Sequence, residues 1–513
     1  MNLPVVIRKL ARPLFSTGPA GPTRAPTGSP VSPANCLVAP TGSRLYRRLL
    51  IGLALILVGC KGLPTASEKQ ARQQAADIAA AYRPSGNKPA LPTLTANSSL
   101  QEFLTFALFN HPKIEAAYFD WSASVERITT ARSLPDPQIT FQMDIQNIVT
   151  SIMPGLMMSF PGPGKLRAGA DVASAESDAR YFAFQSAVLD AAFAVKQSFF
   201  QLYFLDEKIR VNRETLALLG DLEKLARAQN AVGKVTLQDI LRAQIEKDRL
   251  TTEVANLEDS KSSLKARFKE ALGLQADQAD PPVPQHLETA SVDLDTDALL
   301  ETAYAQNPRI AAMKADVRRA EAAIALARKG RIPDFSAGLM ADVKLNPILY
   351  RPLGTVTLPI WRDKIAAQIA EAQANKSAAE ARLTAEQISL AVDLAEKSFM
   401  LREARRNLLL LDQQLLPKAR QSLEVARIAY LSGRLDFFNL SDSERTLLGF
   451  QLDQIDARNQ RELASAQISL LILGTPPEAS LSPKAKPQGP ESKAQSPKSM
   501  AQPPLFENLP VSK

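Results

Sequence analysis

The sequence predicts a mainly α-helical chain with a small β part, built from a helix–β-hairpin–long helix–turn–helix module that occurs twice. Two short stretches, about 136–160 and about 334–359, alternate apolar and polar residues between prolines and glycines, which is typical of β-hairpins with one apolar face. Most of the remaining chain repeats apolar residues every three or four positions, which is typical of amphipathic helices. The order and spacing of these elements agree between the two halves.

The N-terminal region, residues 1–59, is interpreted as a leader that ends in a lipoprotein signal peptide. Basic residues precede an apolar run of about ten residues, which is too short to span a membrane. The run ends in Leu-Val-Gly-Cys, which resembles a bacterial lipobox. This resemblance implies that Cys60 carries a covalent lipid and begins the mature chain, that Cys36 is removed, and that Lys61 directs the protein to the outer membrane. A plain signal peptide with a chance cysteine is the alternative.

Residues 60–98 are interpreted as a lipid-anchored, polar, Pro-containing segment that leads into the first folded part. The first module is expected over residues 99–274. Ser99 and Glu102 fit a capping box ahead of an apolar-periodic run, so a helix is expected to begin there. Pro112 is expected to break this helix before the chain reaches the first hairpin.

The stretch from Leu166 to about Asn230 contains no proline and predicts one helix, roughly 95–100 Å long at 1.5 Å per residue. A helix of this length cannot be buried in one globular core, so we expect it to pack along other helices. Gly233 predicts a tight reversal, since a turn between antiparallel helices favours a left-handed residue. A second helix is expected over 237–272.

A Pro-containing linker is expected over 275–296, and the second module over 297–474. Within this module we expect a helix broken near Pro308 and then the second hairpin. A long helix interrupted at Pro417, a reversal at Gly433 and a final helix complete the module. Residues 475–513 are rich in Pro, Ser and Lys and are predicted to be disordered.

The two modules indicate an internal duplication. Matching positions are separated by 196 residues for the first pair and by 201 for the last, so the spacing drifts by only a few residues across the module. The pairs are Pro112 and Pro308, Asp136 and Asp334, Pro161 and Pro359, Gly233 and Gly433, and Gly273 and Gly474.

The duplicated module resembles the outer membrane efflux protein family, the TolC-like exit ducts of tripartite pumps. The resemblance covers about Leu100 to Gly474 and includes the Leu-Pro-Asp-Pro sequence before the first hairpin and the Phe-Pro-Gly-Pro-Gly-Lys sequence after it. It implies a homotrimer with a twelve-stranded transmembrane β-barrel and a periplasmic α-barrel. It also implies docking to a periplasmic adaptor protein and an inner membrane transporter. By the lipobox, the chain is similar to the lipoprotein branch of the family.

The helix reversals resemble the periplasmic tips of this family, which dock the adaptor and open the duct. The resemblance places adaptor docking at Gly233, Lys234, Gly433 and Arg434. It places the pore constriction at Asn439, which is neutral, and Asp442. Asp239, the counterpart of Asn439 in the first module, and Asp436 are the other acidic candidates, and a ring of carboxylates there would favour cations. Ordinary C-cap glycines and solvated helix charges are the alternatives for these residues.

Four methionines, Met143, Met153, Met157 and Met158, lie in the first hairpin. Thioethers bind soft Cu(I), so a copper or silver path is one interpretation, and lipid-facing or turn-filling methionine is the other. Lys165 and Lys364 are expected near lipid headgroups at the junction of strands and helices. His111, beside a proline, is interpreted as a helix-break residue.

Composition excludes several other classes of function. The formal net charge is +8, but acidic and basic residues are interleaved, so no nucleic-acid-binding stripe is present. The two histidines, His111 and His286, are too few for an ordinary His-built zinc site, and no set of Cys and His has metal-binding spacing. No catalytic constellation or phosphate-binding loop is found either. We therefore expect no enzyme activity, no metal site and no cofactor besides the lipid on Cys60.

Two other interpretations remain open at this stage. One is a lipid-anchored coiled-coil scaffold lipoprotein without channel activity. The other is a periplasmic adaptor, which the position of two hairpins opposite the helix turns disfavours. The sequence does not identify the exported solute, although the Leu-Pro-Asp-Pro and Pro-Gly-Lys pattern resembles metal-efflux members slightly more.

Overall fold

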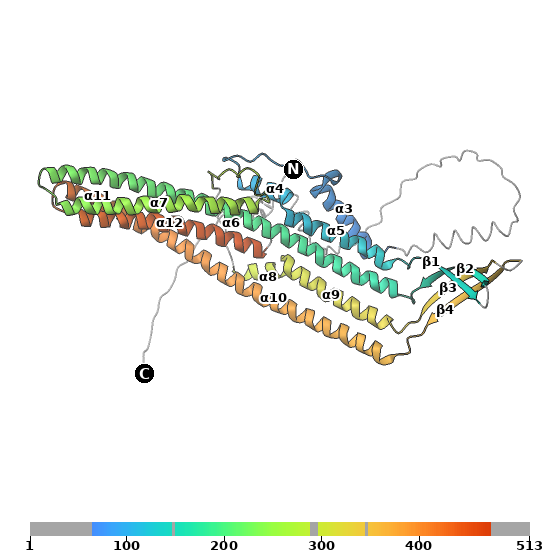
Figure 1. Cartoon of the computed structure of the whole chain (residues 1–513). Helices are drawn as coiled ribbons and strands as arrows, with labels where there is room; N and C mark the ends of the chain where they lie inside the picture. The colour runs from blue at the N-terminus through green and yellow to red at the C-terminus, as the bar shows by residue number, and fades with distance from the viewer. Residues whose placement is uncertain (1–63, 146–148, 288–295, 344–346, 473–513) are drawn as a thin grey trace, which may run out of the picture.

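The computed structural model describes residues 64–145, 149–287, 296–343 and 347–472. This part of the chain is elongated, with the strands at one end and the turns between long helices at the other (Figure 1). The predicted leader, Cys60, Gly474 and the C-terminal tail lie outside the described residues.

The expected module order occurs twice, so the mainly helical fold with a small β part is confirmed. The first half contains α3 (Ala66–Tyr82), α4 (Leu100–Asn110), α5 (Pro112–Arg132), β1 (Gln138–Ile145), β2 (Val149–Phe160), α6 (Lys165–Ala231) and α7 (Leu237–Ala271). The second contains α8 (Thr296–Gln306), α9 (Pro308–Lys329), β3 (Asp334–Asp342), β4 (Leu349–Thr357), α10 (Arg362–Leu410), the π-helical turn η2 (Leu411–Leu415), α11 (Leu416–Leu431) and α12 (Phe437–Ile472).

Helix starts follow local capping chemistry. The Ser99 side chain accepts from the backbone N–H of Glu102, and the Glu102 side chain accepts from the N–H of Ser99, so the predicted capping box is present. Pro112 and Pro308 each occupy the first turn of a helix, where a missing N–H costs nothing. The two proline breaks are therefore helix starts.

The helix α6 is the centre of the fold. Its 67 residues span about 100 Å, and it packs against α5, α7, α9 and α12. Large aromatic side chains fill the space between α6 and the N-terminal helices. Trp121 and Phe184 stack with ring centroids 6.0 Å apart, and Phe103 packs on Phe268 at 5.2 Å. This apolar contact along its length replaces a single globular core.

The strands form one antiparallel sheet in the order β1-β2-β3-β4, so the two predicted hairpins are joined through β2 and β3. The predicted alternation places the apolar side chains on one face, where many are bare: Ile139 is 71% exposed and Phe141 74%. The opposite face carries mainly Gln, Thr, Ser and Asp side chains. Within the described residues β1 and β4 are the edge strands.

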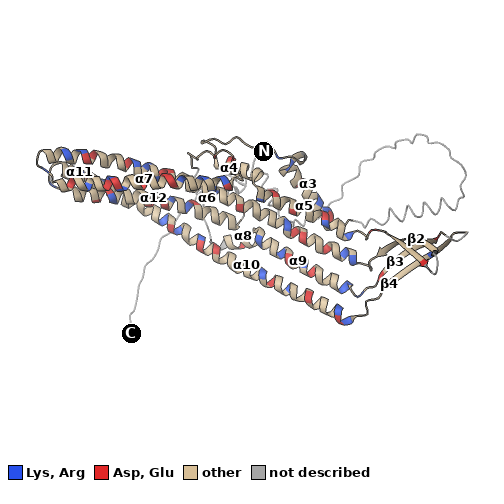
Figure 2. Ribbon diagram, viewed as in Figure 1, with Lys and Arg blue, Asp and Glu red and all other residues tan. Residues whose placement is uncertain are grey.

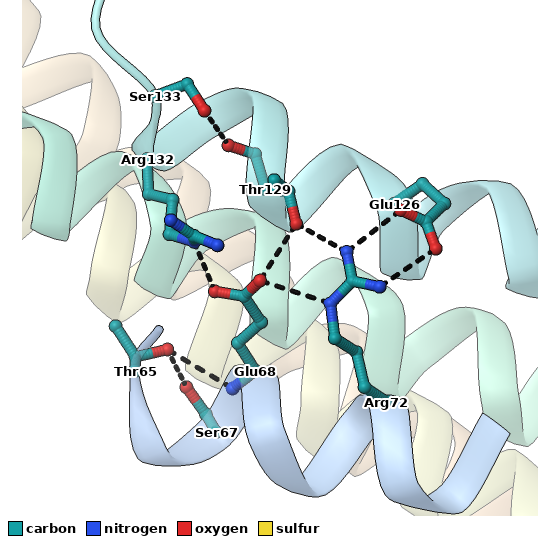
Figure 3. A network of polar contacts seen from close by, with 8 residues as sticks. All are labelled: Thr65, Ser67, Glu68, Arg72, Glu126, Thr129, Arg132 and Ser133. Carbon is teal, nitrogen blue, oxygen red and sulfur yellow. Dashed lines mark hydrogen bonds and ion pairs between the residues drawn. The ribbon is translucent and has the colours of Figure 1, made fainter. Parts of the chain in front are cut away.

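The helix α3 was not expected from the sequence, which suggested only a polar leader there. A buried carboxylate fixes it to α5 (Figure 3). Glu68 accepts from Arg132 at 2.5 Å and from Thr129 at 2.8 Å, and both donors lie in the last turns of α5. Arg72 donates to Glu68 and also to Glu126. The segment that follows the predicted lipid anchor is thus packed on the helical body.

The sequence predicted that Pro417 alone would interrupt the second long helix, but the interruption begins earlier, at a π-helical turn. The turn η2 precedes Pro417, and α10, η2 and α11 follow one another without a loop. A π turn adds one residue to a helical turn, and it lets the proline sit in the first turn of α11.

Across the described residues, no helix has both the length and the hydropathy needed to cross a membrane.

Candidate functional site

The two helix reversals have the same backbone geometry. Gly233 and Gly433 adopt left-handed φ values of +74° and +71°. In each turn the glycine N–H donates to the carbonyl three residues earlier, and the next residue donates five residues back, from Lys234 to Gln229 and from Arg434 to Ala429, both at 2.9 Å. This Schellman-like pattern satisfies the free carbonyls of the helix end, and it explains the glycines by local structure.

The predicted constriction residues lie at the start of the helix that follows each turn, α7 or α12, and two of them cap these helices. Asp239 completes a capping box with Thr236, whose N–H it accepts at 3.0 Å. Asp436 accepts from the backbone N–H of Asn439 at 3.1 Å and from its side chain at 2.6 Å. Asp442 lies exposed one turn further along α12. The structure therefore brings these groups to one end of the molecule and gives Asp239 and Asp436 a capping role.

The two helical hairpins are fastened together near this end. Arg445 of α12 forms an ion pair with Glu246 of α7, with Nε 2.9 Å from a carboxylate oxygen. Arg242 of α7 lies over the ring of Phe438 at 5.5 Å. Beside these contacts, one apolar cluster joins α6, α7, α11 and α12, consisting of Leu219, Leu222, Ala243, Leu250, Ala426, Tyr430, Phe437 and Leu440. A displacement of α7 relative to α12 at this point would break the Arg445–Glu246 ion pair and the Arg242–Phe438 contact.

Sequence analysis missed two buried carboxylates near the turns. Glu223 of α6 is satisfied by Arg227, Gln244 and Lys247, and these hydrogen bonds lower its pKa to about 2. Glu444 of α12 is only 4% exposed, and its Oε2 atom accepts no hydrogen bond from any described residue. Burial raises the pKa of Glu444 to about 7. The only sequence signal for Glu444 was its spacing: Leu440 lies four residues before it and Leu447 three residues after it, which puts all three on one face of the helix.

The junction of strands and helices is held by a carboxylate. Asp334, at the start of β3, accepts from the N–H of Gly162 at 2.6 Å and from Lys165 at 2.7 Å. Lys165 begins α6 and Lys364 lies in the first turn of α10, so both predicted headgroup residues are at the junction. Lys and Arg recur at the helix ends that face the sheet (Figure 2).

The remaining candidates, His111 and the hairpin methionines, do not form one site in the structure. His111 caps α5, since its Nδ1 accepts from the N–H of Lys113 at 3.1 Å, and burial lowers its pKa. The hairpin methionines divide between the faces of the sheet: Met143 and Met158 share the apolar face, while Met153 and Met157 share the polar one. Among the described residues, no group of three or more His, Cys, Asp and Glu side chains could hold a metal ion.

Comparison with known proteins gives the same fold. The family model described as outer membrane efflux protein matches residues 104–274 and 299–474. The chain is 22% identical to the cobalt-zinc-cadmium resistance protein CzcC of Cupriavidus metallidurans, over 73% of this chain and 90% of that protein. A membrane protein from Pseudomonas aeruginosa superposes with a TM-score of 0.66 at 18% identity, over 77% of this chain and 98% of that one. VceC of Vibrio cholerae gives 0.62 at 15% identity, over 73% and 95%.

Proposed function

Because this chain belongs to the outer membrane efflux protein family, we propose that it is the outer membrane exit duct of a tripartite efflux pump, working as a homotrimer. The family is one of efflux proteins rather than enzymes. The observation that carries the proposal is the sheet with a bare apolar face at one end of helices about 100 Å long. Such a sheet suits lipid on one face and an aqueous lumen on the other.

The unpaired edges of β1 and β4 support the trimer. Strands cross a bilayer only as a closed barrel, because an open edge leaves backbone groups without partners. Four strands are too few to close, since the smallest such barrels have eight. Three copies would pool twelve strands, and the long helices would continue the pore into the periplasm.

Bare apolar side chains on the helices also favour contact between copies. On α7, Leu237, Leu241 and Ile245 are each at least half exposed and lie four residues apart, on one face of the helix. On α10, Ile388 and Val392 have the same spacing and are about 60% exposed. Stripes of this kind are costly in water, and a neighbouring copy would bury them.

We further propose that the turns at Gly233, Lys234, Gly433 and Arg434 dock a periplasmic adaptor, which links the duct to an inner membrane transporter. Both turns are exposed at the end of the molecule away from the strands (Figure 1). The likeness to a cobalt-zinc-cadmium resistance protein makes metal ions candidate substrates, beside organic compounds.

The decisive experiment is single-channel recording of the purified protein in planar bilayers, with its mass measured in detergent. Asp442→Ala removes a charge from the proposed constriction. Asp436→Ser removes a second charge but keeps a capping oxygen, so helix stability is preserved. We expect discrete openings from a trimer and larger openings from both variants. A monomeric, non-conducting protein would leave a lipid-anchored helical scaffold as the function.

We also propose that Cys60 carries acyl chains and anchors the duct beside its barrel. The support is the lipobox-like sequence and the packing of α3, which begins six residues later, against the end of α5 that adjoins the strands. Two or more acyl chains give stable membrane attachment. Labelling cells with radioactive palmitate tests this, because Cys60→Ala should abolish the label. A labelled Cys60→Ala protein would refute the assignment.

A further inference from the structure

The two modules are joined by a carboxylate contact beside the sheet. Asp334, the first residue of β3, accepts from the N–H of Gly162 at 2.6 Å and from Lys165 at 2.7 Å. Gly162 lies in the connection from β2 to α6, and Lys165 is the first residue of α6. The contact therefore ties the end of one hairpin to the start of the other, next to the point where β2 pairs with β3.

The internal duplication supplies a second copy of each half of this contact. Asp136, just before β1, matches Asp334 at a separation of 198 residues. Arg362 matches Lys165, since each is the first residue of the long helix that follows its hairpin. Both Asp136 and Arg362 are exposed, and their side chains form no hydrogen bond or ion pair with any described residue. Within one chain this second contact is therefore incomplete.

The two incomplete halves lie at opposite edges of the sheet. Asp136 adjoins β1 and Arg362 follows β4, which are the edge strands of the described sheet. Three strand spacings separate these edges, about 14 Å, so the halves cannot meet within one chain. Every residue of β4 is exposed. The partner that fits this edge is β1 of a second copy, because that copy carries the matching half of the contact.

We propose that β4 of one copy pairs with β1 of the next in the same register that joins β2 to β3. Arg362 then forms an ion pair with Asp136 of the next copy, as Lys165 does with Asp334 inside the chain. The charges are complementary, and both groups come to the contact unpaired. Repeating the step around the ring brings every open strand edge to a partner edge, so a closed barrel needs no other contact between strands.

The alternation of side chains supports this register independently. Shifting the β2–β3 pairs by the separation of 198 places Val356 opposite Ile139 of the next copy. It places Thr357 opposite Gln138 of the next copy. Val356 is 54% exposed and Ile139 is 71% exposed in the single chain, so the first pair joins two bare apolar side chains on the apolar face. The second pair is polar and lies on the other face. A register shifted by one residue would oppose apolar to polar side chains throughout.

Disulfide crosslinking of the purified full-length protein in detergent tests the register. Gln138→Cys/Thr357→Cys and Ile139→Cys/Val356→Cys each put one cysteine on each edge of the sheet. Opposed residues alternate between close and wide pairs, so at least one of these variants has cysteines near enough to bond. We expect covalent trimers from it on a non-reducing gel. Gln138→Cys/Thr355→Cys, shifted by two residues along β4, is the control and should not crosslink.

Reversing the charges tests the ion pair. Asp136→Arg opposes two guanidinium groups at the contact, and it should speed dissociation of the trimer in SDS at least about tenfold, because like charges at an interface are costly. Arg362→Asp should have the same effect. The Asp136→Arg/Arg362→Asp variant carries the pair in reverse and should return to within about threefold of the wild-type rate. A double variant that dissociates as fast as the single variants would overturn the pairing.

This inference rests on the proposed trimer, and planar-bilayer recording separates the two. Channel openings from a trimer that crosslinks only in the control variant, or in no variant, would refute the register and keep the duct. A crosslinked trimer that gives no openings would keep the contact between copies and refute the duct. A monomeric protein in detergent would refute both.

Discussion

The unpaired carboxyl of Glu444 should make the packing of the helix turns depend on pH. Its pKa is about 7 in the folded protein, against an ordinary value of 4.5. A carboxyl with a raised folded pKa stabilises the folded state fully below its unfolded pKa. This stability is lost as pH rises from about 4.5 through about 7. We therefore expect α11 and α12 to open locally more often at pH 8 than at pH 5.

The size of the effect follows from the shift. One pKa unit corresponds to about 1.4 kcal/mol, so burying the ionised carboxylate costs roughly 3 kcal/mol at pH 8 and less than about 1 kcal/mol at pH 5. Glu444→Gln keeps the shape and removes the charge. It should therefore recover most of this energy at pH 8 and change little at pH 5.

Hydrogen exchange measured by mass spectrometry reports such local opening. After correction for the intrinsic exchange rate at each pH, amides near Glu444 should exchange about 100-fold more slowly in Glu444→Gln than in the wild type at pH 8. At pH 5 the difference should be within about fivefold. Asp453→Asn, an exposed carboxylate on the same helix, is the control and should show no difference. If the ratio of exchange rates between the wild type and Glu444→Gln were the same at pH 8 and pH 5, the reasoning would be refuted.

Two further results are expected. Gly273→Ala should lower the melting temperature in circular dichroism much more than Gly433→Ala. Both glycines have φ of +71°, which costs alanine about 1–2 kcal/mol. Only at Gly273 would the new Cβ also lie 2.6 Å from a backbone atom of His111, so equal shifts would contradict this contact. Glu68→Ala should cost about 3–5 kcal/mol by removing the buried carboxylate that accepts from Arg132, Thr129 and Arg72, and it should expose α3 to trypsin. Glu126→Ala, which removes an exposed carboxylate, should leave α3 protected.

The long helices and the strands were predictable because their signals are local. Alternation over a few residues assigned Ile139 and Phe141 to the apolar face, and the left-handed turn at Gly233 followed from the demands of a helix reversal. The same rules placed the break at Pro112.

Features that depend on contacts between distant residues were not predictable. The helix α3 is rich in alanine, so its apolar face is a weak sequence signal. That face packs Ile78 and Tyr82 into the main apolar cluster, and Glu68 bonds to Arg132, which lies 64 residues away. Glu444 looks like a solvated helix charge until the fold is assembled, where it is only 4% exposed. Which methionines share a face depended on the register between β1 and β2, because it relates Met143 of one strand to Met153, Met157 and Met158 of the other.

The turn η2 gives a record of how the two halves of the chain diverged. The separation of matching residues increases from 198 at Pro161 and Pro359 to 200 at Gly233 and Gly433, so the second long helix has gained residues. One residue inserted into a regular α-helix rotates everything after it by about 100°. A π turn absorbs one such residue within a single turn, so η2 accounts for one of the two extra residues. After the copies separated, η2 would have let the second helix lengthen while α11 kept its original face toward α12.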